Sequence, residues 1–253
     1  MQGYPMKLYD NSRTVSNEQE ILIAFRKRSL LSYQQHHCIR DIQYAEQQRA
    51  NFDYFPLDHA KKTLIFLHGG YWQWCDKSDF AFISAEVLAK DMQCVLLEYD
   101  LAPHSRLGEM VVQVKAALDF LQQQAWINGQ VLLVGHSAGA HLAAMLLDHP
   151  LITEAALLSG IYDLAPIQKT HLNAALDLSE NEIMRFSPIS VHDRFNKPYR
   201  IYCGKQELDE LKWQSRHYFE QRRGIDQDLV SFTELKNIHH YNILDAYFSQ
   251  ILK

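Results

Sequence analysis

The 253-residue sequence contains few cysteines, which limits the kinds of covalent and metal cross-link it can form. The 4 cysteines are scattered along the chain, at Cys38, Cys75, Cys94 and Cys203. They lack the close paired spacing of a disulfide framework or a zinc site. We therefore predict reduced thiols, no disulfide, no bound metal and no other cofactor.

Long apolar runs and basic blocks are also missing. No stretch approaches the ~20 consecutive apolar residues of a membrane-spanning helix, and residues 1–16 lack the basic and apolar parts of a secretory signal. The 25 Lys and Arg residues are outnumbered by 30 Asp and Glu residues, which gives a net charge of −5. Nucleic acids and anionic membranes attract basic surfaces, so we expect a cytoplasmic protein that binds neither. A homodimer is expected only because dimers are the commonest soluble oligomers.

Short β-rich runs alternate with longer segments of helical periodicity. Residues 63–67 are continuously apolar, as in a central strand covered on both faces. Further strands are predicted at residues 39–45, 51–55, 94–99, 131–134, 155–158, 200–203 and 229–235, and helices at 80–88, 110–121, 138–147, 211–223 and 242–252. This alternation predicts an α/β fold with a mostly parallel central sheet flanked by helices on both faces.

The domain organisation is expected to be simple, because the sequence has neither internal repeats nor a linker. We predict one domain over residues 1–253. Residues 160–196 are irregular and contain two prolines. They form either a lid over the strand ends or an ordinary insertion that packs on the sheet.

The strongest chemical signal is the segment Gly135-His136-Ser137-Ala138-Gly139. It follows the strand at 131–134 directly and opens the next helix, which is the context of a nucleophile turn of the G-x-S-x-G type. Side chains at the two glycine positions would clash in such a sharp corner. The turn would raise the Ser137 hydroxyl above the sheet, near a helix N-terminus that favours a developing anion. The alternative is an ordinary glycine-rich turn in which Ser137 caps the helix.

A second glycine-containing loop, His68-Gly69-Gly70-Tyr71-Trp72, follows the strand at 63–67. In α/β-hydrolases a loop at this place supplies backbone donors of the oxyanion hole, together with the amide that follows the serine. We assign this role to the amides of Gly70, Tyr71 and Ala138. The alternative is a tight turn that buries two aromatic side chains.

The serine needs a base and an acid, which in this fold follow it in the order acid, then histidine. The loop after the last predicted strand contains His239 and His240, and both fit the position of the base. Neighbouring side chains rarely converge on one metal ion, so this pair is not expected to bind a metal. The loop after the strand at 200–203 offers Glu207, Asp209 and Glu210 as acids. Glu207 is favoured, Asp209 is second, and Glu210 is explained by the helix dipole alone.

With these residues in view, the chain resembles the kynurenine formamidases (arylformamidases) of the α/β-hydrolase superfamily. The resemblance runs from Tyr9 to the final helix and rests on several motifs. These are His68–Gln73, Tyr99-Asp100-Leu101-Ala102-Pro103, Gly135–Met145, Ser159-Gly160-Ile161-Tyr162-Asp163-Leu164, Phe186-Ser187-Pro188 and His240-Tyr241. Two departures are a glutamate at 207, where the animal enzymes carry aspartate, and Leu211 in place of the usual phenylalanine.

The resemblance implies a triad of Ser137, Glu207 and His240. It also implies a serine hydrolase that cleaves the N-formyl amide of an arylamine, converting N-formyl-L-kynurenine to L-kynurenine and formate in tryptophan degradation. An aromatic leaving group would stack on Trp72. One alternative is a general carboxylesterase on small acyl or aryl esters, because bacterial relatives with the same motifs are known only as esterases. The other is a hydrolase-fold protein that binds a ligand without catalysis.

Overall fold

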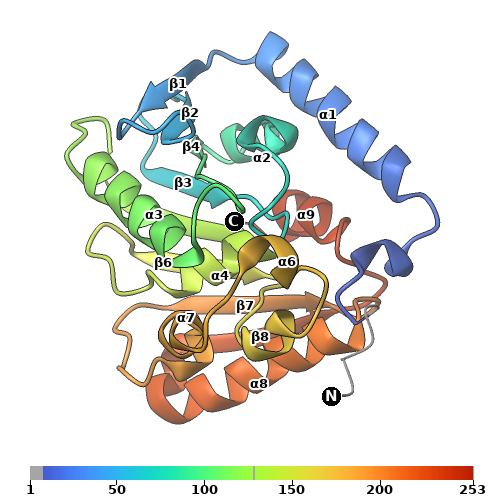
Figure 1. The fold of residues 1–253 in the computed structure, drawn as a ribbon. Helices are drawn as coiled ribbons and strands as arrows, with labels where there is room; N and C mark the ends of the chain where they lie inside the picture. Colours follow the sequence, from blue (N-terminus) through green and yellow to red (C-terminus); the bar gives the residue numbers. More distant parts are fainter. Residues whose placement is uncertain (1–7, 128, 253) are drawn as a thin grey trace.

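The computed structural model describes residues 8–127 and 129–252, which contain an eight-stranded sheet with helices on both faces (Figure 1). The strand order is β1-β2-β4-β3-β5-β6-β7-β8. The pairs β1–β2 and β2–β4 are antiparallel, and every other pair is parallel. The strands are β1 (Ile39–Gln43), β2 (Asn51–Phe55), β3 (Lys62–Leu67), β4 (Met92–Leu97), β5 (Gln130–His136), β6 (Glu154–Leu158), β7 (Tyr199–Gly204) and β8 (Val230–Leu235). The mostly parallel α/β sheet predicted from the sequence is confirmed.

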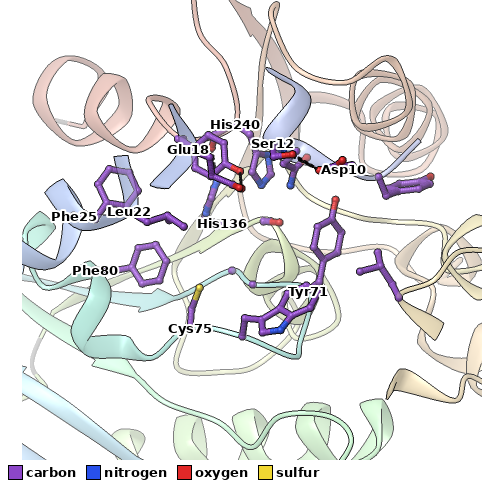
Figure 2. Close-up of a pocket in the computed structure, with 18 of the residues that line it drawn as sticks. Asp10, Ser12, Glu18, Leu22, Phe25, Tyr71, Cys75, Phe80, His136 and His240 are labelled. Atoms are coloured by element: carbon purple, nitrogen blue, oxygen red, sulfur yellow. Dashed lines mark hydrogen bonds between the residues drawn. The ribbon is translucent and has the colours of Figure 1, made fainter. Parts of the chain in front are cut away.

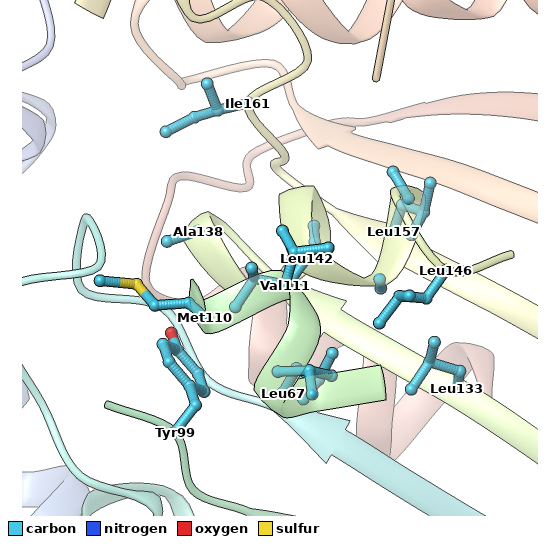
Figure 3. Close-up of a cluster of buried hydrophobic side chains, with 14 of the residues drawn as sticks. Leu67, Tyr99, Met110, Val111, Leu133, Ala138, Leu142, Leu146, Leu157 and Ile161 are labelled. Carbon is cyan, nitrogen blue, oxygen red and sulfur yellow. The ribbon is translucent and has the colours of Figure 1, made fainter. Parts of the chain in front are cut away.

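The central strands are buried on both faces, as continuous apolar sequence predicts. In β3, Leu64 and Phe66 contribute to one hydrophobic cluster, whereas Ile65 and Leu67 contribute to the other. One cluster joins the sheet to α1 (Glu18–Gln35), α2 (Ile83–Leu88) and α9 (Ile243–Asp245). The other joins it to α3 (Leu107–Gln122), α4 (Ala138–Ala144) and α8 (Asp209–Asp226), and Figure 3 shows part of it.

The long helix α1 was not predicted, and its sequence explains why. Its buried positions are Phe25, Ser29 and Ser32, so two of the three inward residues are serines and the apolar periodicity is weak. The Ser29 hydroxyl donates to the Asp79 carbonyl at 2.9 Å, and Ser32 bonds Ser84 on α2 at 2.6 Å. The helix is thus held by polar as well as apolar contacts.

The last helical segment begins as α9 and continues with wider turns through Ala246–Ile251, over most of the range predicted for a closing helix. Residues 160–196 contain the short helices α5 (Ala165–Gln168), α6 (Asn173–Leu176) and α7 (Glu180–Phe186). Figure 1 shows α6 and α7 (yellow-orange) in front of the sheet.

Candidate active site

Ser137 is the single residue between β5 and α4. Its φ of 55° and ψ of −118° are rarely adopted by residues with side chains, and its amide donates to the Leu158 carbonyl at 2.8 Å. A Cβ atom on Gly139 would lie 2.1 Å from the Leu67 carbonyl oxygen, and one on Gly135 would lie 2.3 Å from the Gly139 oxygen. Both glycines are therefore needed for the close approach of α4 to β3 and β5. This is the corner expected of a nucleophile turn.

The loop after β3 has an unusual backbone. Gly70, Tyr71 and Trp72 have φ values of 112°, 48° and 59°, and a Cβ atom on Gly70 would lie 2.1 Å from the Trp74 carbonyl oxygen. Among the turn, loop and cap hydrogen bonds of the described residues, none uses the amide of Gly70, Tyr71 or Ala138 as donor. These amides are therefore available to an anion, and their role as oxyanion donors remains a prediction.

A buried ionic network holds the start of this loop. The imidazole of His68 bonds Glu98 at 2.9 Å through Nε2, and Arg49 donates to the same carboxylate oxygen at 2.6 Å. The other Glu98 oxygen accepts the Lys77 amide at 2.8 Å. Tyr99 donates its hydroxyl to the His68 carbonyl at 2.8 Å and stacks on the His68 ring. The network fixes the direction in which the chain leaves β3.

The loops after β7 and β8 bring Glu207 and His240 together. His240 Nδ1 lies 2.9 Å from Glu207 Oε2, and both residues are 4% exposed. Because a carboxylate only accepts hydrogen bonds, Nδ1 carries the proton and Nε2 is left to accept one from a hydroxyl. In the described part of the chain no hydrogen bond joins the Ser137 and His240 side chains, but both line one cavity. Catalytic hydrogen bonds of this kind often form only with substrate bound.

The competing candidates lie elsewhere. The Asp209 side chain is 92% exposed and pairs with Lys212 at 2.8 Å. Glu210 is in the first turn of α8. The His239 ring accepts the Tyr241 amide through Nδ1 at 3.2 Å, and His239 is absent from the cavity lining. Of the alternatives raised by the sequence, only Glu207 and His240 form an acid–imidazole pair.

Ser159 also contacts the acid, and sequence reasoning gave it no role. It directly follows β6, has a φ of 50°, is fully buried, and donates its hydroxyl to Glu207 Oε1. Each carboxylate oxygen of Glu207 therefore accepts one hydrogen bond. Its position in the sequence could have indicated this role, because a polar residue at the carboxyl end of a central parallel strand lies at the edge of the sheet where sites form.

His136 holds the other side of His240. Its Nε2 atom donates to the His240 carbonyl at 2.9 Å. Burial, and secondarily the positive charge that His240 can carry, hold the pKa of His136 well below its usual value of 6.5. His136 therefore stays neutral and fixes the His240 backbone without placing a second cation beside that ring.

Four of the candidate residues, Gly70, Tyr71, Ser137 and His240, line a cavity of about 320 Å³ (Figure 2). Its wall includes the aromatic residues Phe25, Tyr71, Trp74, Phe80 and Tyr241. Trp72, which the sequence predicts to bind substrate, is not part of this wall. Trp72 is fully buried against His141 and does not line the cavity, whereas Trp74 does and is 51% exposed. The left-handed turn at Tyr71 and Trp72 sends the Trp72 ring into the core.

Within residues 8–127 and 129–252, no group of three or more His, Cys, Asp or Glu side chains could hold a metal ion. No helix in the same part of the chain is long and apolar enough to cross a membrane.

The chain is similar to a protein family model, to kynurenine formamidases of known sequence and to solved hydrolase structures. The BD-FAE family model matches residues 54–212. The kynurenine formamidase of Salmo salar is 34% identical over 222 residues, which cover 81% of this chain and 75% of the relative. The kynurenine formamidase of Danio rerio is 31% identical over 82% of this chain and 76% of the relative. Among solved structures, a candidate thioesterase from Silicibacter sp. tm1040 superposes with a TM-score of 0.88 at 22% identity, covering 98% of this chain and 97% of that one. Esterase B of Lactobacillus rhamnosis superposes with a TM-score of 0.71 at 15% identity, covering 93% and 89%.

Proposed function

This chain belongs to the kynurenine formamidase family of α/β-hydrolases, and we propose that it hydrolyses N-formyl-L-kynurenine to L-kynurenine and formate. Family membership supports an arylformamidase-like hydrolase. The observation that carries the mechanism is the buried Glu207–His240 pair, whose histidine lines the same cavity as Ser137.

In the proposed acylation step, Ser137 Oγ attacks the formyl carbon while His240 Nε2 takes the hydroxyl proton. The carbonyl oxygen becomes an anion, which the amides of Gly70, Tyr71 and Ala138 stabilise. The C–N bond then breaks, and His240 returns the proton to the departing arylamine. Glu207 keeps the imidazole in the required tautomer and stabilises its cation.

Deacylation uses the same groups. A water molecule attacks the formyl-serine ester while His240 takes its proton, and the ester bond breaks to give formate and free Ser137. Because formyl is the smallest acyl group, crowding beside the strained oxyanion loop is tolerated on the acyl side. The aromatic wall contacts the leaving group, with Trp74 in the position first expected for Trp72.

The test compares kcat/KM for N-formylkynurenine with kcat/KM for 4-nitrophenyl acetate. We expect turnover of both, because esters have the better leaving group and the same machinery serves them. Ester hydrolysis without any formamide hydrolysis would overturn the proposal in favour of a general carboxylesterase. Failure of a fluorophosphonate to label Ser137 would instead favour a non-catalytic binding protein.

Three further points remain proposals. His171 and Leu172 line the cavity, which supports a lid role for residues 160–196 in a single-domain protein. A homodimer and a cytoplasmic location follow from the composition arguments alone. Hydrodynamic measurement and cell fractionation test them directly.

A further inference from the structure

Among the described residues, the Asp, Glu, Lys and Arg side chains that line the cavity are all acidic. Asp10 and Glu18 line the cavity together with Ser137 and His240, whereas no Lys or Arg of the described chain does so. We infer that this cavity selects aromatic formamides that carry a positively charged amino group, and that Asp10 and Glu18 bind that group. The inference rests on the proposed function and specifies which end of the substrate is recognised.

Within residues 8–127 and 129–252, each carboxylate has one oxygen engaged and one without a hydrogen bond. Glu18 Oε1 accepts the hydroxyl of Tyr241, the residue after His240, and no described group bonds Oε2. Asp10 Oδ1 accepts the Ser12 amide at 3.2 Å and the Ser12 hydroxyl at 2.6 Å, and no described group bonds Oδ2. Neither residue pairs with a Lys or Arg of the described chain. Two carboxylates therefore face the cavity without a lysine or arginine partner from the described part of the chain.

Two buried polar atoms in the same wall also lack partners. Among the described residues, no group accepts the Tyr71 O–H and none donates to the Asn11 side-chain oxygen, although the residues are only 7% and 8% exposed. The Asn11 side chain lies beside the Tyr71 hydroxyl and partly offsets the rise that burial causes in its pKa. Figure 2 shows the Tyr71 ring rising from the oxyanion loop toward Asp10 and Ser12. Burial keeps Tyr71 protonated by raising its pKa well above 10. Unpaired buried polar atoms are rare in folded proteins and often mark a site completed by a ligand.

An ammonium group supplies what these atoms lack. It has three N–H donors and no acceptor, so it can bond a free carboxylate oxygen and the unpaired oxygens of Tyr71 and Asn11. A hydrogen bond between an ammonium and a carboxylate is about twice as strong as a neutral one. The surrounding aromatic rings, such as Phe25 and Tyr241, also favour a cation over an anion.

The carboxylate of an amino-acid substrate has no such partner. His171 is the one basic side chain of the described lining other than His136 and His240. We therefore expect the substrate carboxylate to lie toward the opening and to contribute little to kcat/KM.

The experiment uses three matched substrates and the full-length protein. They are N-formylkynurenine, its analogue without the α-amino group, and its analogue without the carboxyl group. For the wild type, loss of the amino group should lower kcat/KM at least tenfold, and loss of the carboxyl group should lower it less than threefold. A larger effect of the carboxyl group would overturn the inference.

The variants Glu18→Gln and Asp10→Asn keep the shape of each side chain and remove its charge. Each should reduce, by about tenfold, the ratio of kcat/KM for the amino substrate to that for the deaminated analogue. Glu20→Gln is the matched control, because Glu20 is an exposed residue of the same helix outside the cavity lining. If the two carboxylates had a purely structural role, each substitution would lower kcat/KM equally for both substrates. An unchanged ratio in both cavity variants would therefore overturn the inference.

The inference can be tested separately if the proposed formamidase activity is absent. If no formanilide is hydrolysed, the charge preference is measured by competitive inhibition of 4-nitrophenyl acetate hydrolysis. The inhibitors are decarboxylated kynurenine, which is a cation, and deaminated kynurenine, which is an anion. Tighter inhibition by the cation would support the inference, and equal or tighter inhibition by the anion would overturn it.

Discussion

Replacement of Ser159 by alanine tests whether the buried acid needs both of its hydrogen bonds. In Ser159→Ala, Glu207 keeps the bond from His240 at 2.9 Å and loses the bond to Oε1. Water cannot easily replace the lost donor, because Ser159 is fully buried and Glu207 is 4% exposed. A hydrogen bond to a charged group contributes about 1.5–3 kcal/mol, and about 1.4 kcal/mol corresponds to tenfold in rate. We therefore expect kcat/KM to fall roughly 10- to 100-fold if the loss acts fully on the transition state.

The assay measures kcat/KM for N-formylkynurenine and for 4-nitrophenyl acetate, together with urea unfolding of each variant. Ser215→Ala is the matched control, since Ser215 is also fully buried but, among the described residues, makes no hydrogen bond to Glu207 or His240. In Ser159→Ala, kcat/KM should fall by the same factor for both substrates, because the acid acts through His240 in either reaction. Wild-type kcat/KM in folded Ser159→Ala, or an equal loss in Ser215→Ala, would refute the reasoning.

The remaining predictions concern the nucleophile turn, the base and the buried histidines. Ser137→Ala and His240→Ala should each lower kcat/KM about 10³-fold or more with circular dichroism unchanged; near-wild-type rates would contradict the triad. Gly139→Ala should lower the free energy of unfolding in urea by about 1–3 kcal/mol, because its Cβ would lie 2.1 Å from a β3 carbonyl oxygen; an unchanged midpoint would show that β3 and α4 separate at little cost. Burial lowers the pKa of His136 well below 6.5 and that of His141 to about 4. Below about pH 6.5 the unfolded chain binds protons that the folded chain excludes, so the free energy of unfolding should fall toward pH 4 by at most about 1.4 kcal/mol per pH unit for each histidine. His141→Gln should flatten this slope in urea titrations at successive pH values. An unaltered slope would show that His141 does not contribute to the pH dependence of the free energy of unfolding.

The features that were predictable from sequence are local in the chain. The strand, the Gly-x-Ser-x-Gly turn and the following helix are contiguous, so composition and periodicity define them together. The sheet follows from the alternation of strands and helices, since parallel strands need crossover segments. Chain order narrowed the candidates for the catalytic acid and base to three acids and two histidines. Only the positions of the two loops in the structure show that Glu207 and His240 pair.

The features that were missed depend on backbone geometry or on distant segments. Residues 71 and 72 share left-handed φ values, which reverse the side-chain directions that a regular loop would give and place Trp74 rather than Trp72 in the cavity. Ser159 meets Glu207 across 48 positions of sequence. The serine-rich inner face of α1 concealed the helix that brings Glu18 and Phe25 to the cavity.

The residues that form the cavity wall and the candidate catalytic residues come largely from different parts of the chain. Residues 9–25 supply much of the cavity wall, whereas the candidate catalytic residues all follow strands of the sheet further along the chain. A mutation in the first segment can thus alter what enters while the reacting groups keep their places. Exchanging this segment between homologues should therefore change ligand preference while the catalytic residues stay the same.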